Sequence, residues 1–139
     1  MNGFDTDVLT ELFAGNVVYA QRFAAIDSDK RGIPIGAAAE IVRGWLNAVR
    51  QAEAGKGRMS LEYAFGRFQQ SLVDMAPFTL LPYTPAAAAL FQQWRAAKIR
   101  IGTNDLRIAA ICTVHGATLV TRNARDYARI PGLTFDVWN

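Results

Sequence analysis

Acidic side chains recur where a short apolar stretch of the sequence passes into a helix-like stretch. Asp5 and Asp7 follow the opening "GF", Glu40 lies early in "AAAEIVRGW", and Asp105 stands in "TNDLRIAAIC". A cluster of carboxylates repels itself unless cations neutralise it, and all-oxygen ligand sets select hard metals such as Mg²⁺ or Mn²⁺. If these acids converge, metal-assisted phosphoryl chemistry is the natural use of the site.

Short apolar stretches alternate with longer helix-like stretches, which predicts an α/β fold with a parallel sheet covered on both faces. The expected strands are residues 3–5, 32–36, 78–83, 117–121 and 133–138, and the expected helices are residues 8–15, 17–26, 37–55, 60–75, 84–98, 103–116 and 123–130. Ser60 and Thr84 are the predicted N-caps of two of these helices. Ligands of open parallel sheets bind outside the carboxyl ends of the strands, so we expect the acids to project toward one end of the sheet.

Two further polar residues fall at the same end of the predicted sheet. Asn123 follows the expected strand "TLVT" directly, and Asp126 comes one helical turn later. Asp126 is equally explained as an ion-pair partner of Arg122 or Arg129.

Each aspartate near a helix start also has a purely structural interpretation, because aspartate is a favoured N-cap. Asp5, Asp7 and Asp105 all precede apolar periodic runs. Glu40 is harder to explain in this way, since small residues surround it and its charge would be partly buried. The residues alone therefore leave open whether Asp5 and Asp7 form a catalytic pair, or whether one is a metal ligand and the other begins a helix.

Other catalytic arrangements find little support in the sequence. The single histidine, His115, stands at a predicted helix end, and the single cysteine, Cys112, lies among apolar residues and is predicted to be buried and inert. A glycine-rich phosphate loop and zinc-type Cys/His spacing are both absent.

Length and charge set broader limits. The 139 residues fit one domain, 1–139, and half of them are hydrophobic. The net charge is +3, and basic residues outnumber acidic ones after residue 90, which suits a polyanionic partner but equally describes a solvated basic face. No apolar run reaches the roughly 20 residues of a membrane helix, so we expect no membrane association and a cytoplasmic location.

Four blocks in order carry a resemblance that spans the chain: "FDTDVLTEL", "AAAEIVRG", "GTNDLRIAAIC" and "LVTRNARDYARIPGLTFDVW". They resemble the successive motifs of PIN-domain ribonucleases, specifically the VapC toxins of type II toxin–antitoxin pairs. The resemblance implies a three-layer α/β/α fold, an acidic pocket that holds Mg²⁺ or Mn²⁺, and endonucleolytic hydrolysis of RNA by a metal-activated water.

The resemblance also implies roles for individual residues. Asp5, Glu40 and Asp105 match the acids that ligate the metal, and Thr6 is expected to hydrogen-bond within the site. Asp7 then becomes a helix-start residue turned away from the pocket. Asn123 stands where some family members carry a fourth aspartate, so either its amide oxygen or the nearby Asp126 is expected to take that catalytic position.

Substrate and partners follow from the same resemblance. The substrate is expected to be RNA, such as tRNA or another structured RNA, positioned by Arg107, Arg122 or Arg125. The implied partners are a second copy of the chain and a cognate antitoxin, which blocks the pocket with an arginine or lysine.

Two alternatives remain. "DTDVL" also matches the nucleophile loop of haloacid-dehalogenase-like phosphatases, but Thr103 stands where that family needs an acid, and no lysine is suitably placed. The other alternative is a non-catalytic RNA-binding or interaction module on the same fold, supported only by Asn123. A test of metal binding would distinguish this module from the nuclease, because only the nuclease should bind the metal.

Overall fold

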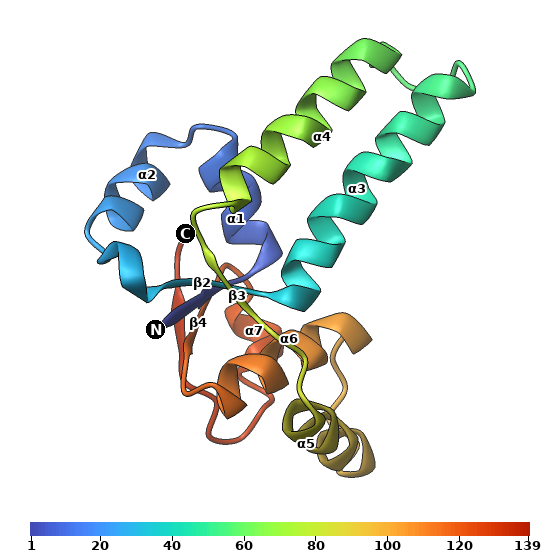
Figure 1. Cartoon of the computed structure of the whole chain (residues 1–139). Coiled ribbons are helices and arrows are strands. Elements are labelled where there is room, and N and C mark those ends of the chain that lie inside the picture. The colour runs from blue at the N-terminus through green and yellow to red at the C-terminus, as the bar shows by residue number, and fades with distance from the viewer.

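The computed structural model describes residues 1–139, and five parallel strands form the centre of the molecule (Figure 1). The strands are β1 (Asn2–Phe4), β2 (Arg31–Pro34), β3 (Thr79–Leu81), β4 (Thr118–Thr121) and β5 (Phe135–Val137). Their order across the sheet is β3-β2-β1-β4-β5. The predicted α/β class with a parallel sheet is confirmed.

Seven α-helices connect or follow the strands. They are α1 (Thr6–Phe13), α2 (Val17–Ala24), α3 (Ile35–Glu53), α4 (Leu61–Met75), α5 (Pro85–Ala96), α6 (Thr103–Val114) and α7 (Ala124–Tyr127), with a short 3-10 helix at Ser28–Lys30. The predicted caps are present, since Ser60 Oγ accepts from Tyr63 N and Thr84 Oγ1 from Ala87 N. Helix α3 begins two residues earlier than predicted, because β2 already ends at Pro34.

Neighbouring residues of the central strand point to opposite layers of helices. The Phe4 ring packs edge-on against Phe23 of α2, with the ring centroids 5.6 Å apart. Gly3 faces the other side, where a Cβ atom would lie 2.6 Å from Cys112 Sγ of α6. A side chain at position 3 would therefore require Cys112 or its helix to shift, and the glycine allows α6 to pack closely on the sheet.

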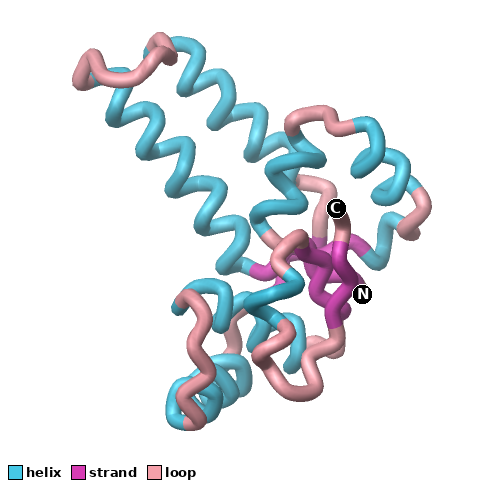
Figure 2. The backbone as a smooth tube through the Cα atoms, turned by 180° about the vertical axis from the view of Figure 1, so that it is seen from behind, coloured by secondary structure: helices cyan, strands magenta, loops and turns pink.

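Helices α3 and α4 form a long hairpin that projects from the sheet (Figures 1 and 2). Its base is anchored by the buried Ala37, Ala38 and Ile41. Large apolar side chains stay exposed on it: Leu46, Tyr63, Phe65, Leu72 and Val73. None of the helices has the length and apolarity needed to cross a bilayer.

Cys112 and His115 are the two residues for which the sequence supported no catalytic arrangement, and the structure shows the surroundings of both. Cys112 is fully buried, as predicted, and burial raises the pKa of its thiol to about 12. His115 ends α6, and its Nε2 lies 3.1 Å from the carbonyl oxygen of Pro82.

Candidate active site

The candidate site lies where the order of the sheet reverses. From the central β1 the chain moves to β2 on one side and later to β4 on the other, so a crevice forms outside the carboxyl ends of β1 and β4. Asp5 follows β1, and Arg122 and Asn123 follow β4. Because Phe4 pairs with Val120, the next residues, Asp5 and Thr121, stand opposite each other.

Asp5 is held from two sides. Its Oδ1 accepts from Thr6 N at 2.8 Å, which makes it the N-cap of α1, and its Oδ2 accepts from the Thr121 hydroxyl at 2.8 Å. Only 4% of Asp5 is exposed. The N-cap and functional interpretations of Asp5 are thus compatible, because capping uses only one of its two carboxylate oxygens.

The surroundings of Asp5 raise its pKa from 3.8 to about 7. Burial is the main cause, the neighbouring charge of Asp7 is the next, and Asp105 contributes as well, while the hydrogen bonds from Thr121 and Thr6 act in the opposite direction. A carboxyl with a pKa near neutrality, inside a crevice and beside other acids, is typical of functional sites.

Asp7 belongs to this cluster, and the expectation that it turns away from the site was wrong. Its carboxylate accepts from the backbone N of Arg122 at 3.2 and 3.3 Å, so it faces the end of β4. Burial raises the pKa of Asp7, and the charge of Glu40 adds to that effect. Asp7 is the second residue of α1 and lies on the helix face that meets the crevice. The two-residue spacing from Asp5 in the sequence did not indicate this orientation.

Glu40 reaches the site through Asn104. The Asn104 side-chain amide donates to Glu40 Oε1 and, at 3.0 Å, to the carbonyl oxygen of Gly36, so it links the first turns of α6 and α3. A Cβ at Gly36 would approach Asn104 Oδ1 to 3.1 Å, and the missing side chain allows this close approach. Sequence reasoning missed Asn104, although it directly precedes Asp105 in the motif "TND".

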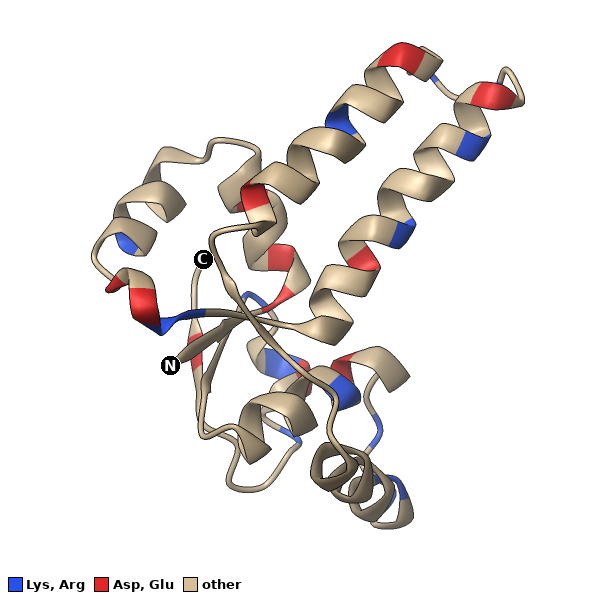
Figure 3. Ribbon diagram, viewed as in Figure 1, with Lys and Arg blue, Asp and Glu red and all other residues tan.

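Asp105 completes the cluster from the first turn of α6. Burial raises its pKa, followed by the charges of Glu40, Asp126 and Asp7. In Figure 3 the acidic segments of α1, α3 and α6 lie around one end of the sheet. Chain segments that are far apart in the sequence therefore share one electrostatic environment.

Asn123 and Asp126, the two candidates for the fourth acidic position, are hydrogen-bonded to each other. Asn123 caps α7, with its Oδ1 accepting from Asp126 N at 3.3 Å and its amide donating to Asp126 Oδ2 at 2.9 Å. The charge of Asp126 raises the pKa of Asp105, and a 3.7 Å ion pair links Asp126 to Arg129. An asparagine is uncharged, so of these two residues only Asp126 adds negative charge near Asp105.

Thr6 and the three arginines expected to position RNA differ in their contacts with the rest of the protein. The Thr6 hydroxyl is buried and has no protein hydrogen-bond partner. Arg107 stacks its guanidinium 4.9 Å from the Phe91 ring centroid, Arg122 pairs with Glu11 at 3.0 Å, and Arg125 is exposed.

A groove along α3 begins at the acidic cluster and contains residues that sequence reasoning missed. Thr6 and Glu40 line one end, and Arg43, Asn47 and Arg50 follow at helical spacing along its length. A repeat of three and four residues places these polar side chains on one face of the helix. This spacing was the available signal, but it was hidden within a long, well-formed helix.

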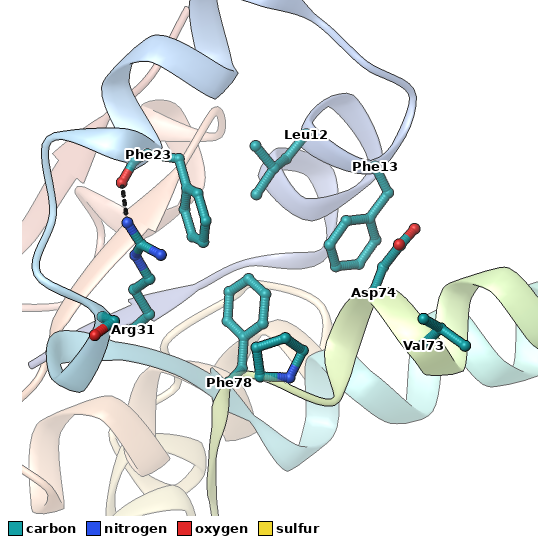
Figure 4. Close-up of a pocket in the computed structure, with 9 residues that line it drawn as sticks. Leu12, Phe13, Phe23, Arg31, Val73, Asp74 and Phe78 are labelled. Atoms are coloured by element: carbon teal, nitrogen blue, oxygen red, sulfur yellow. Dashed lines mark hydrogen bonds between the residues drawn. The ribbon is translucent and has the colours of Figure 1, made fainter.

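A separate apolar hollow lies between the C-terminal ends of α1 and α4 and the chain around β2 (Figure 4). Leu12, Phe13, Phe23 and Phe78 point into it. Arg31 forms one wall, with its guanidinium 4.1 Å from the Phe23 ring centroid and donating to the Phe23 carbonyl.

The donor set at the crevice fits a hard divalent cation. Asp5, Glu40 and Asp105 supply only oxygen atoms, and burial together with mutual repulsion raises the pKa of both aspartates. The Tyr127 hydroxyl is buried in the same place without a hydrogen-bond partner. No three acidic, histidine or cysteine side chains are gathered tightly enough to enclose an ion in this structure.

Fold and site together define a three-layer α/β protein with an acidic crevice at the switch point of its sheet. The model of the PIN domain matches residues 4–133. The chain therefore belongs to the PIN-domain family, which decides against the haloacid-dehalogenase-like alternative.

Named relatives agree with this placement. Ribonuclease VapC1 from Rickettsia felis is 37% identical over 73 residues, which cover 50% of this chain and 52% of the relative. Ribonuclease VapC4 from Mycobacterium tuberculosis is 33% identical over 100 residues, covering 72% and 71% of the two chains. The aligned stretch thus spans about half of the first relative and over two thirds of the second.

A solved structure confirms the fold over almost the whole chain. The VapBC2 complex from Rickettsia felis, bound to a DNA fragment from their promoter, contains a chain that superposes with a TM-score of 0.78 at 19% identity. The match covers 99% of this chain and 98% of that one.

Proposed function

We propose that this chain is a divalent-metal-dependent endoribonuclease of the VapC toxin type, which hydrolyses RNA phosphodiester bonds and is held inactive by a cognate antitoxin. One observation carries the proposal: Asp5, Asp7, Glu40 and Asp105 come from three helices, and their charges raise the pKa values of the three aspartates at the carboxyl end of the sheet. Membership of the PIN-domain family and similarity to ribonucleases named VapC support the same reaction.

Asp5, Glu40 and Asp105 would hold Mg²⁺ or Mn²⁺, with Asp126 adding charge beside Asp105. The cation, when bound, supplies Lewis acidity that activates water and neutralises charge on the scissile phosphate. Thr121 and Asn104 fix the orientation of Asp5 and Glu40 by donating to their carboxylates. Held in this way, the two carboxylates lose little conformational entropy when they bind a ligand.

The groove along α3 binds the RNA backbone. Arg43 and Arg50 line it beyond Glu40, so a strand whose scissile phosphate lies at the carboxylates can pass both guanidinium groups. Neither arginine forms an ion pair within the protein, whereas Arg122 is already paired with Glu11. Arg107 and Arg125 remain further candidates for positioning the RNA.

A salt titration tests this path with a labelled single-stranded oligoribonucleotide and the cleavage-deficient Asp5→Asn background. Arg43→Ala and Arg50→Ala should each weaken binding and reduce the slope of log affinity against log salt by about 0.7, the value for one phosphate contact on a single strand. Arg58→Ala, in the exposed loop between α3 and α4, is the matched control. Equal slopes for all variants would place the RNA elsewhere.

The apolar hollow of Figure 4 receives the antitoxin in this proposal. Its aromatic lining offers apolar surface, while Arg31 and Asp74 at its walls allow contacts with either charge. Val73 lines the hollow and is 58% exposed, so Val73→Arg should stop copurification with the cognate antitoxin but leave RNA cleavage intact. Val17→Arg, at an exposed position on α2 outside the hollow, should keep the antitoxin bound.

A homodimer belongs to the same proposal. The exposed Tyr63, Phe65 and Leu72 on the projecting α3–α4 hairpin support self-association, because such surface is usually covered by a partner. Sedimentation velocity on the purified chain tests it, and a single-chain mass at all micromolar concentrations would contradict it.

The decisive experiment is cleavage of total RNA by the antitoxin-free chain with Mg²⁺ or Mn²⁺, and with EDTA instead. We expect discrete fragments that depend on the metal and disappear in Asp5→Asn. Asp29→Asn, which changes an exposed aspartate outside the site, is the matched control and should cleave normally.

The non-catalytic alternative makes the opposite prediction. Without cleavage under either metal, and without stabilisation of the thermal melt by millimolar Mn²⁺, the chain would be an RNA-binding or interaction module. Asn123 is the sequence feature that favours this module, and the proposal assigns the charge missing there to Asp126, which raises the pKa of Asp105.

A further inference from the structure

A second hollow lies beside the acidic crevice, where the start of α3, the loop between β3 and α5, and helix α6 meet (Figure 1). Its volume is about 330 Å³. Ile35, Ala39 and Ile111 give it apolar walls, and Tyr83, Asn104 and Arg107 add an aromatic ring and two polar groups. Apolar walls with a few polar groups are typical of sites for small ring systems, and we call this site the Tyr83 hollow.

The Tyr83 hollow is continuous with the groove along α3. Ile35 and Ala39 line both, so the two meet over the first turns of α3. Asn104, in the wall of the hollow, donates to the Glu40 carboxylate of the crevice. An RNA strand whose scissile phosphate lies at the carboxylates therefore passes the mouth of the hollow.

Tyr83 presents its ring from a loop that is fixed on both sides. The carbonyl oxygen of Pro82 lies 3.1 Å from His115 Nε2, and the Thr84 hydroxyl caps α5 by accepting from Ala87 N. The Tyr83 side chain nevertheless stays 38% exposed. A rigidly held, half-exposed aromatic ring is the kind of platform on which unpaired bases stack.

The two polar groups of the hollow are free to bind a ligand. Arg107 is exposed and forms no ion pair, and its guanidinium is held 4.9 Å from the Phe91 ring centroid. Asn104 donates both amide hydrogens within the protein, to Gly36 and Glu40, whereas its Oδ1 accepts from no protein group and is not buried. The hollow thus offers a donor and an acceptor to the edges of a base.

We propose that the Tyr83 hollow binds one unpaired base of the RNA, stacked on the Tyr83 ring and hydrogen-bonded by Arg107 and Asn104. The inference rests on the proposed function and names the part of that site that contacts a base. Because a paired base cannot enter the hollow, the substrate at this point is single-stranded RNA or a loop of a structured RNA.

Two oligomers test this role in the cleavage-deficient Asp5→Asn background: a labelled single-stranded oligoribonucleotide, and an oligomer of the same length built of abasic nucleotides, which keeps the phosphates but lacks bases. Tyr83→Ala should weaken binding of the first by about fivefold or more, the loss of one stacked base, and leave binding of the second unchanged. Tyr83→Phe keeps the ring and should bind both like the parent chain. Arg43→Ala, in the groove that contacts phosphates, should weaken both oligomers equally.

Equal effects of Tyr83→Ala on the two oligomers, or no effect on either, would overturn the inference. Tyr83→Leu, which keeps an apolar side chain without the ring, repeats the comparison if the alanine variant fails to fold. Sedimentation velocity adds a further check: a dimer that becomes a monomer in Tyr83→Ala would make the hollow a contact between subunits and overturn its role in binding a base.

The same measurements separate this inference from the proposed function. A wild-type chain that cleaves RNA, with Tyr83→Ala equally affected on both oligomers, overturns only the role of the hollow. A chain that prefers the oligoribonucleotide through Tyr83 but cleaves no RNA overturns the nuclease and leaves the base site standing. A chain that binds neither oligomer overturns both.

Discussion

Asp5→Asn should stabilise the metal-free protein at alkaline pH, even though it removes a central residue of the proposed site. Asp5 is 4% exposed and lies beside the charge of Asp7, so ionised Asp5 is unfavourable in the folded chain. Asparagine has nearly the same shape without the charge. Its oxygen can still accept from Thr6 N, whereas the Thr121 hydroxyl must reorient to meet an amide in place of a carboxylate oxygen.

The size of the effect follows from the shift in pKa. A change from 3.8 to about 7 corresponds to about 4 kcal/mol of destabilisation once Asp5 is ionised in both states. The imperfect hydrogen bond to Thr121 offsets about 1 kcal/mol of the gain. The variant should therefore be more stable by about 2–3 kcal/mol at pH 8.5, or roughly 6–12 °C in melting temperature for a chain of this length.

The pH dependence gives the sign of the effect. Between about pH 4 and pH 7 folded Asp5 holds a proton that the unfolded chain has released, so wild-type stability falls as the pH rises through this window. Below the unfolded pKa of 3.8 both states are protonated and the penalty is absent. The advantage of Asp5→Asn should thus shrink to about zero near pH 4.5.

Urea unfolding in EDTA at several values between pH 4.5 and pH 8.5 measures this difference, with exposed Asp29→Asn as the control. The free energy of unfolding of Asp29→Asn should follow the wild type at every pH. Parallel curves for Asp5→Asn and the wild type would refute the burial argument, because they would mean that Asp5 has the same pKa folded and unfolded.

Two more predictions concern the residues that hold the acids in place. Thr121→Val removes the hydroxyl that lowers the pKa of Asp5, so the midpoint of the pH dependence of stability should move upward, and an unmoved midpoint would contradict the role of that hydrogen bond. Gly36→Ala places a Cβ 3.1 Å from Asn104 Oδ1 and should lower metal-dependent cleavage by loosening that side chain. Gly66→Ala, in α4 with open space around it, should leave cleavage unchanged and raise stability by about 1 kcal/mol, and equal cleavage by both glycine variants would argue against the contact.

Local sequence signals were sufficient for the elements of the fold. Short apolar runs, helical apolar patterns, the caps at Ser60 and Thr84, and the glycines that end helices act within a few residues of the chain. The alternation of strands and helices then favoured a parallel sheet, because parallel strands need such crossovers. The start of α3 was missed by two residues, since the transition from Pro34 into a helix has no side-chain cap.

The site could be predicted only in part. Asp5, Glu40 and Asp105 could be proposed from the sequence because each stands near the start of a helix-like stretch in a recognisable motif. Asp7 was misjudged, and Thr121, Asn104 and Tyr83 were not singled out. Their roles depend on partners far along the chain, as the 116-residue separation between Thr121 and Asp5 illustrates.

The sequence by itself thus determined the order of strands and helices, the parallel sheet and the types of side chain available for a metal site, because these depend on local pattern and composition. Only the tertiary structure decided which acids interact, which hydroxyl holds Asp5, which hydroxyls are left unpaired, and which arginines line a groove beyond Glu40. Burial and charge repulsion set the pKa of Asp5, and both are properties of the packed chain that no stretch of sequence contains.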